Sequence, residues 1–182
     1  DSLACVKAVD MTKVSKIMDI GTGAGFPGVP LKIAFPHLEA CLLDSLKKRV
    51  NFLEETFALL KLANITAIHG RAEEFAKNKA YREQYDLCVS RAVSNLATLS
   101  EYCLPYVKVG GNFISYKSGT VQEELQQAEK AVKILGGKIQ DVVYFNLPDS
   151  EIQRSLVVIE KMKPTPGRYP RKAGTPLKEP LS

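Results

Sequence analysis

A glycine-rich turn directly after a short apolar segment constrains the fold of this chain more than any other feature. Residues 17–20 lead into Asp19-Ile20-Gly21-Thr22-Gly23-Ala24-Gly25-Phe26-Pro27-Gly28. Glycines at alternate positions permit positive φ angles and let the backbone approach a ligand closely. In an open parallel sheet such a turn lies at the carboxyl ends of the strands, where ligands bind. The turn therefore predicts a strand, a ligand site and a following helix.

Other short segments are continuously apolar instead of alternating between apolar and polar residues. Strands have this composition when helices cover both faces of a parallel sheet. Besides 17–20 and a strand at 65–69, we expect strands at residues 40–43, 87–89, 113–116 and 156–159.

Residues with helical spacing lie between these segments. A stripe over residues 46–60 follows Ser45, which we interpret as its N-cap. A second stripe covers 96–103, and a third covers 121–135 and stops at Gly136, as the end of a helix should.

The alternation of strand and helix from about residue 16 to 118 predicts an α/β protein with a doubly wound, mostly parallel, Rossmann-like sheet. Residues 142–145 and 155–161, joined by the polar loop 147–154, predict an antiparallel C-terminal strand pair at its edge. We expect one domain over residues 1–182. Asp1 carries no start signal, so we expect that an N-terminal segment precedes it.

The basic residues are concentrated at the C-terminal end. The net charge is +5, and residues 161–178 contain six basic residues, four prolines and no acidic residue. Proline prevents a helix and keeps such a segment extended. We expect the tail, residues 163–182, to follow a polyanion such as RNA, with Tyr169 stacked on an unpaired base and phosphates held by Lys163, Arg168, Arg171 and Lys172. The alternative, on charge alone, is a solvated terminus.

Cysteine spacing and hydropathy exclude several classes of protein. The four cysteines form no C-x-x-C pair, and only two histidines are present, so we interpret the cysteines as reduced core thiols and expect no metal site. No run of eighteen apolar residues and no secretory signal occurs. We therefore expect a soluble cytoplasmic protein without a membrane partner.

Three successive strand ends carry residues that suit a nucleoside. After the glycines Gly21, Gly23 and Gly25, Asp44 closes the second strand and can accept hydrogen bonds from both ribose hydroxyls. Ala72 and Glu73 follow the third strand and can meet an adenine ring. The alternatives are that Asp44 caps the next helix and that Glu73 merely favours a helix N-terminus.

Register and charge distinguish two ligand classes at this site. The run 23–28 formally matches the dinucleotide pattern G-x-G-x-x-G, but the first glycine after the strand is Gly21, from which the third position falls on Phe26. Asp19 would also repel a pyrophosphate, and Pro27 removes an amide from the helix start. S-adenosylmethionine, with its ammonium and sulfonium, is favoured over a nicotinamide cofactor.

The motifs together resemble one family. The glycine loop with its Phe-Pro-Gly ending and the tail sequence Tyr-Pro-Arg-Lys-Ala-Gly-Thr-Pro are similar to those of the RsmG (GidB) methyltransferases, as are Asp44-Ser45, Lys47-Lys48-Arg49, Arg71-Ala72-Glu73 and Ser90-Arg91-Ala92-Val93. The resemblance implies a class I methyltransferase that moves a methyl group from S-adenosylmethionine to N7 of one guanosine in 16S ribosomal RNA, as free RNA or in the small subunit. It also implies an additional N-terminal helical region, and cofactor contacts from Gly21, Phe26, Ala72, Glu73 and Arg91.

Chemistry at N7 needs few protein groups. Guanine N7 carries a lone pair at neutral pH and can attack the sulfonium methyl without first losing a proton, so we assign no catalytic acid or base. Arg91 either holds the carboxylate of the donor, or faces the guanine or its phosphate, or pairs with a nearby acid. Alternatives for the whole chain are a nicotinamide-dependent oxidoreductase, an RNA-binding module, and a methyltransferase acting on another RNA or a small molecule.

Overall fold

The fold is built on a single twisted sheet. A computed structural model describes residues 1–91 and 94–182. Within these residues seven strands pair in the order β3-β2-β1-β4-β5-β7-β6. The strands are β1 (Lys16–Ile20), β2 (Glu39–Asp44), β3 (Ile65–His69), β4 (Tyr85–Ser90), β5 (Val107–Ser118), β6 (Gly137–Asn146) and β7 (Gln153–Lys161).

Strands β1 to β5 run parallel, and β7 lies between β5 and β6, antiparallel to both. The doubly wound, mostly parallel sheet and the antiparallel β6–β7 pair are thus confirmed. The loop between them is shorter than predicted, because β7 begins at Gln153. The chain runs outward from β1 to β2 and β3 and then crosses back to β4 on the other side of β1. The switch point where α/β sheets bind ligands therefore lies at the carboxyl ends of β1 and β4.

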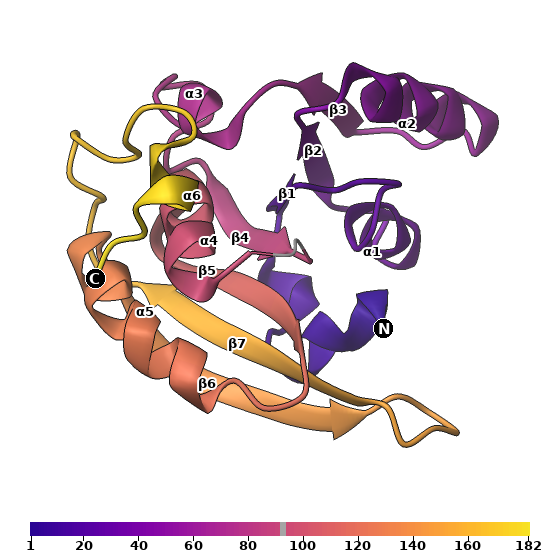
Figure 1. Ribbon diagram of the computed structural model, residues 1–182. Helices are drawn as coiled ribbons and strands as arrows, with labels where there is room; N and C mark the ends of the chain where they lie inside the picture. The colour runs from indigo at the N-terminus through magenta and orange to yellow at the C-terminus, as the bar shows by residue number, and fades with distance from the viewer. Residues whose placement is uncertain (92–93) are drawn as a thin grey trace.

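Helices cover both faces of this sheet (Figure 1). Figure 1 shows α4 and α5 together on one side and α1 and α2 beside the other half of the sheet. The helices are α1 (Gly28–Ala34), α2 (Lys47–Leu59), α3 (Ala72–Phe75), α4 (Leu96–Cys103), α5 (Gln122–Ile134) and α6 (Thr175–Lys178), with 3₁₀ turns η1 (Ser2–Lys7), η2 (Met11–Lys13) and η3 (Leu104–Tyr106).

The apolar strands are explained by two cores, one on each face. On β5, Phe113 packs into the core beneath α4 and α5, whereas its neighbour Ile114 packs into the core with α1 and α2. Both side chains are fully buried. Successive side chains on a strand point to opposite faces, so a strand covered on both sides must be apolar throughout. The four cysteines are buried and free, as predicted.

The predicted cap of α2 is wrong. The helix begins at Lys47 with Leu46 as its N-cap, and Ser45 is exposed and makes no capping hydrogen bond. Instead Oδ1 of Asp44 accepts a hydrogen bond of 2.9 Å from the amide of Leu46. A carboxylate at the end of the strand therefore replaces the expected hydroxyl, because it reaches the first free amide of the turn.

The C-terminal tail is not extended throughout, and parts of it are buried. Contrary to our prediction it contains helix α6, whose proline lies in the first turn, where no intrahelical hydrogen bond is lost. Pro176 is buried against α4, and its carbonyl accepts a hydrogen bond of 2.9 Å from Oγ1 of Thr98. The guanidinium of Arg82 donates to the carbonyls of Thr165 and Tyr169 at 2.7 and 2.9 Å. The tail is thus a packed part of the fold.

Candidate cofactor and acceptor site

The glycine loop has the backbone conformation that its sequence predicts. Gly21, Gly23 and Gly25 have φ angles of +70°, +62° and +96°. A Cβ on Gly23 would meet no atom within 4 Å, whereas a Cβ on Gly25 would lie 2.6 Å from Cγ2 of Val29. The absence of a Cβ at Gly25 therefore lets the loop pack closely against α1, whereas the space beside Gly23 is open.

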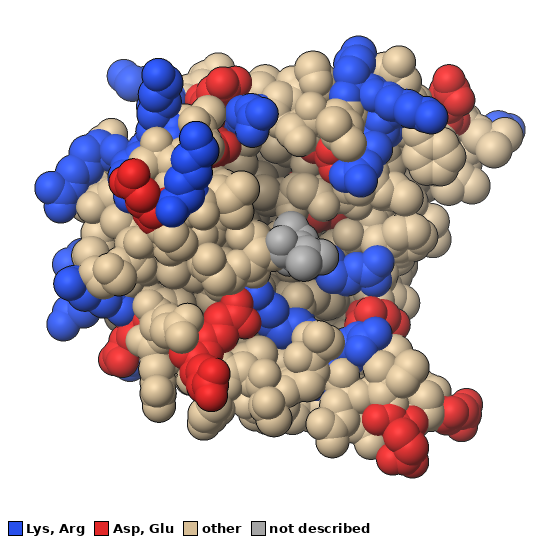
Figure 2. Space-filling model, in the orientation of Figure 1, with Lys and Arg blue, Asp and Glu red and all other residues tan. Residues whose placement is uncertain are grey.

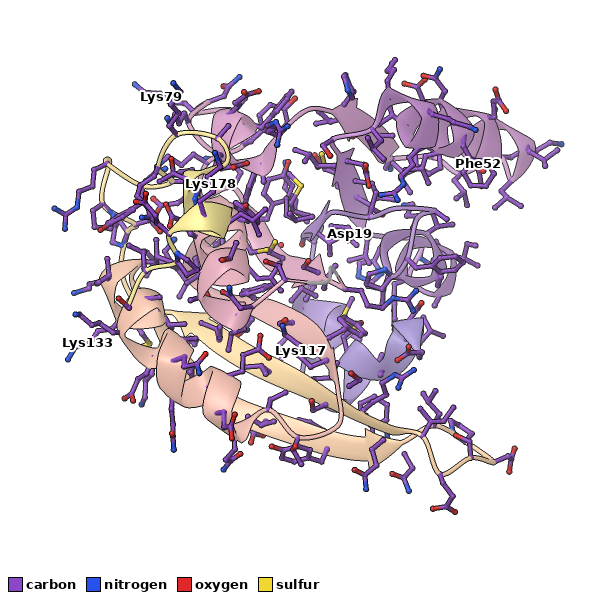
Figure 3. All side chains as sticks on the ribbon, in the orientation of Figure 1. Asp19, Phe52, Lys79, Lys117, Lys133 and Lys178 are labelled. Carbon is purple, nitrogen blue, oxygen red and sulfur yellow. The ribbon has the colours of Figure 1, made fainter. Side chains whose placement is uncertain are left out.

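Asp19 places a buried carboxyl group under this loop (Figure 3). Its Oδ2 accepts hydrogen bonds from Oγ1 of Thr22 at 2.7 Å and from the amide of Gly28 at 2.9 Å. Its Oδ1 is buried without a partner among the described residues. Burial raises the pKa of Asp19 to about 6, against the opposing effect of the bonds from Thr22 and Gly28. An unpartnered buried carboxylate oxygen fits a cationic ligand such as the ammonium of S-adenosylmethionine.

Asp44, at the end of β2, lies beside the glycine loop and forms a second side of the candidate donor site. The carboxylate is buried, and Oδ2 accepts a hydrogen bond of 2.9 Å from the amide of Gly23. Nη1 of Arg49 lies 3.3 Å from the same oxygen. Because Oδ1 also accepts from Leu46, the carboxylate is held at the start of α2 while it lines the cavity. The position fits both predicted roles, ribose acceptor and helix cap. Arg49, in the first turn of α2, belongs to a motif of the family resemblance, but the sequence did not assign it this contact with Asp44.

Ala72 and Glu73 form the third side, at the start of α3, and both are buried. The carbonyl of Ala72 accepts a hydrogen bond of 2.7 Å from the hydroxyl of Tyr106. Oε1 of Glu73 accepts one of 2.8 Å from the amide of Gly174, in the tail. Neither Tyr106 nor Gly174 could be assigned from sequence, since both lie far along the chain. They fix the segment that we expect to face the adenine.

These sides enclose a cavity of about 400 Å³. Five of the eight predicted cofactor residues line it, with Tyr102 beside them: Gly21, Asp44, Ala72, Glu73 and Arg91. Of the other three, Gly23 bonds to Asp44, Gly25 packs on α1, and Phe26 is 44% exposed. Burial raises the pKa of Tyr102 to about 12, with the nearby Glu73 adding to the effect, so Tyr102 presents a neutral hydroxyl.

Arg91 lies where this cavity meets another. Its guanidinium carbon is 5.5 Å from the ring centre of Phe26, and Nη1 is 3.4 Å from Oδ2 of Asp1. Both distances agree with a cation positioned by an aromatic face and a carboxylate. Arg91 and Ser94 line both cavities. Ala92 and Val93, which belong to the same motif, lie outside the described residues.

The second cavity, of about 710 Å³, opens beside the end of β5. Nζ of Lys117 donates hydrogen bonds to Oε1 of Glu124 at 2.6 Å and to the carbonyl of Ser94 at 2.7 Å. Figure 3 shows Asp19 and Lys117 in the central part of the view, where β1 and β5 end. This cavity was not predicted from the sequence. The available signal was a polar residue at the carboxyl end of a parallel strand.

The tail residues predicted to bind RNA divide into two groups. Tyr169 is 7% exposed and lies under Arg168, at 5.1 Å. Arg171 forms a bidentate pair with the fully buried Glu101, with Nε–Oε1 at 3.0 Å and Nη2–Oε2 at 2.7 Å. Tyr169 and Arg171 are therefore held by contacts within the fold, and RNA contacts by these two residues stay a prediction.

Lys163, Arg168 and Lys172 are exposed. Figure 2 shows Lys and Arg side chains gathered at the upper left, over α3, α6 and the tail. A surface with several unpaired cations attracts a polyanion.

Two features are absent from residues 1–91 and 94–182. No group of three or more side chains there could hold a metal ion. None of the helices in this part of the chain is long and apolar enough to cross a membrane.

Comparison with known proteins identifies the family. Residues 1–157 match the family model GidB, described as rRNA small subunit methyltransferase G. The chain belongs to this family. Two relatives named ribosomal RNA small subunit methyltransferase G, from Lachnoclostridium phytofermentans and Alkaliphilus oremlandii, are 55% and 54% identical over 181 residues, which cover all of this chain and 75% and 76% of those proteins. The resemblance is confirmed, and with it a methyltransferase that uses S-adenosylmethionine rather than a nicotinamide cofactor.

Solved structures confirm the Rossmann-like fold. The StiE O-MT region 961–1257 matches with a TM-score of 0.69 and 17% identity, over 88% of this chain and 72% of that one. An O-methyltransferase from a Brevibacillus brevis trans-AT PKS multienzyme, solved with S-adenosyl-L-homocysteine, matches with a TM-score of 0.64 and 15% identity, over 88% and 70%.

Proposed function

We propose that this enzyme transfers the methyl group of S-adenosylmethionine to N7 of a guanosine in 16S ribosomal RNA. The observation that carries the proposal is the pair of adjoining cavities that share Arg91 and Ser94, one beside the glycine loop and one beside Lys117. The names of the relatives support RNA of the small ribosomal subunit as the substrate, free or in the particle. We place the reaction in the bacterial cytoplasm.

The chain's own residues account for binding of the donor. S-adenosylmethionine supplies an electrophilic methyl group on a positively charged sulfur. Asp44 receives the ribose hydroxyls, the segment at Ala72 and Glu73 meets the adenine, and the ionised Asp19 lies under the loop that takes the amino-acid end. Arg91, at the junction of the two cavities, holds a fixed positive charge for the donor carboxylate or the RNA.

Acceptor chemistry requires alignment more than proton transfer. N7 carries its lone pair at neutral pH, so no base has to remove a proton before the attack. Holding N7 in line with the methyl carbon and sulfur lowers the barrier by about 7–11 kcal/mol when the geometry is right. The two adjoining cavities suit this alignment because each reactant has a binding surface of its own.

The RNA is held in part by the tail. Lys163, Arg168 and Lys172 remain exposed and supply phosphate contacts, while the rest of the tail packs on the catalytic fold. We treat residues 1–182 as one methyltransferase domain, since a single sheet joins both cores. The relatives are longer than this chain, which covers about three quarters of their length, and a further segment in them can add RNA contacts.

Incubation with tritiated S-adenosylmethionine and total RNA from bacteria that lack the modification tests this proposal. After fractionation by size, label should occur in 16S ribosomal RNA and not in transfer RNA. Heat-denatured protein provides the background. Label in transfer RNA alone, or in no RNA, would refute 16S RNA as the substrate.

A further inference from the structure

The cavity beside the end of β5 contains a carboxylate and an ammonium group that have no role in the methyl transfer proposed above. Glu124 and Lys117 both line it, with side chains 26% and 12% exposed. Glu124 comes from the first turn of α5, and Lys117 from the end of β5. Two charged groups thus converge from separate elements in a partly desolvated space next to the donor cavity.

The pair leaves hydrogen-bonding capacity for a ligand. Lys117 Nζ uses two donors, to Oε1 of Glu124 and to the carbonyl of Ser94, and an ammonium has three. Oε2 of Glu124 receives no hydrogen bond from the described residues. The cavity therefore offers one donor directly beside carboxylate acceptors.

The Watson–Crick edge of guanine has the complementary pattern. Guanine presents its O6 acceptor next to the N1–H and N2–H₂ donors, whereas adenine presents an amino donor beside an unprotonated nitrogen. Unpaired bases are commonly recognised along this edge. Adenine would set its amino group against the ammonium and its ring nitrogen against the carboxylate, an arrangement that rejects it.

We propose that Glu124 accepts hydrogen bonds from N1–H and N2–H₂ of the target guanine and that Lys117 donates to O6. The inference rests on the proposed function, because it concerns the acceptor of the same reaction. N7 lies across the purine from N1 and N2, so a base held by Glu124 directs its imidazole ring away from that carboxylate. The junction formed by Arg91 and Ser94 then lies on the side where N7 meets the donor.

Binding of nucleoside monophosphates to the S-adenosylhomocysteine complex tests the assignment. GMP should bind the wild type at least roughly tenfold more tightly than IMP, which lacks the 2-amino group and hence one charge-assisted hydrogen bond. AMP should bind more weakly still. Ligand-observed NMR measures all three at millimolar concentration.

Glu124→Gln removes the charge and keeps the shape. It should weaken GMP binding at least tenfold and bring the ratio of the affinities for GMP and IMP to about one. Glu123→Gln is the matched control, since Glu123 is exposed, carries the same charge and does not line this cavity. Lys117→Met should reduce the ratio of the affinity for GMP to the affinity for AMP. A purely structural ion pair would leave both ratios unchanged.

Three outcomes separate the inference from the function on which it rests. A Glu124→Gln protein that melts as the wild type does and keeps the wild-type preference for GMP over IMP overturns the inference. So does a wild type that binds S-adenosylhomocysteine but no GMP. In both cases the methyl-donor site stands. Failure to bind S-adenosylhomocysteine refutes the proposed function itself.

Discussion

The amide of Gly23 donates a hydrogen bond of 2.9 Å to Oδ2 of Asp44, which joins the glycine loop to the end of β2. One carboxylate therefore holds the loop, accepts from Leu46 at the start of α2, and lines the donor cavity. The loop and the ribose wall form one unit, so a change at either residue should affect binding of the donor through both.

Asp44→Ala should weaken binding of S-adenosylmethionine by about 1.5–3 kcal/mol, the scale of hydrogen bonds to a charged group. Isothermal titration calorimetry measures the affinity. Glu39→Ala is the control, because Glu39 is an exposed acid at the opposite end of the same strand. An Asp44→Ala protein with an intact fold and wild-type affinity would remove Asp44 from the site.

Gly23→Ala should impair the donor site more than the fold. A Cβ there meets no protein atom, so the cost to folding is that of a positive φ angle, about 1–2 kcal/mol. Donor affinity should fall further, because strain at Gly23 disturbs the amide that holds Asp44, and Asp44 lines the donor cavity. Gly110→Ala is matched, with φ of +83°, equally open space and a position at the start of β5. Equal donor affinity in the two variants would contradict the assignment.

Donor affinity should depend on pH through Asp19. Its pKa is raised to about 6, so it is neutral below that pH and ionised above it. The ammonium of the donor stays charged across this range, so affinity should rise by up to about tenfold per pH unit between pH 5 and 6 and then level off.

Folding stability has the opposite dependence on pH. The unfolded carboxyl loses its proton near pH 3.8 and the folded one near pH 6, so Asp19 lowers the free energy of unfolding as the pH rises between those values.

Asp19→Asn should bind the donor weakly, and its donor affinity should lack the pH dependence of the wild type. An unchanged pH profile of calorimetric affinity in that variant would exclude Asp19 as the cause.

Arg171 should be a structural residue. Arg171→Ala leaves the fully buried Glu101 without its guanidinium, although the backbone amide of residue 171 still donates to Oε1. It should destabilise the fold by about 3 kcal/mol, the lower end for a broken buried pair, since Arg171 is itself 25% exposed. Lys172→Ala, next to it and exposed, should change stability by less than about 0.5 kcal/mol. Urea unfolding compares them. Equal stability of the two variants would show that the pair contributes nothing.

The exposed tail cations should govern the salt dependence of RNA binding. Each phosphate contact to single-stranded RNA contributes roughly 0.7 to the slope of log affinity against log salt. Replacing Lys163, Arg168 and Lys172 with alanine should therefore reduce the slope by about 2, with donor affinity unchanged. Filter binding of 16S RNA over a salt series measures this. A wild-type slope in the triple variant would place RNA recognition elsewhere.

Local patterns predicted most of the fold because the sheet is covered on both faces. Neighbours such as Phe113 and Ile114 enter different cores, so each strand is an apolar run that the sequence shows directly. The glycine loop and Asp44 were recognisable for a similar reason, since the loop directly follows β1 and Asp44 is the last residue of β2. The prediction of a cap at Ser45 was wrong because α2 begins at Lys47 behind Leu46, and the carboxylate of Asp44 accepts from the amide of Leu46.

Long-range partners account for what the sequence did not reveal. Nothing near Arg171 indicates that Glu101, on α4, will bind its guanidinium, and nothing near Tyr169 indicates that its ring will be buried. A basic, proline-rich segment suggests exposure unless its partners are known. Lys117 and Glu124 likewise meet only because β5 ends beside the first turn of α5.

Nucleoside analysis of the RNA product tests the central claim most directly. 16S RNA and small subunits from bacteria lacking the modification are incubated with this enzyme and S-adenosylmethionine, digested to nucleosides, and examined by mass spectrometry against 7-methylguanosine. We predict about one 7-methylguanosine per 16S RNA with the wild type and a large reduction with Asp44→Ala at limiting donor. Unmethylated RNA after incubation in both forms, or methylation of a base other than guanine, would contradict the account.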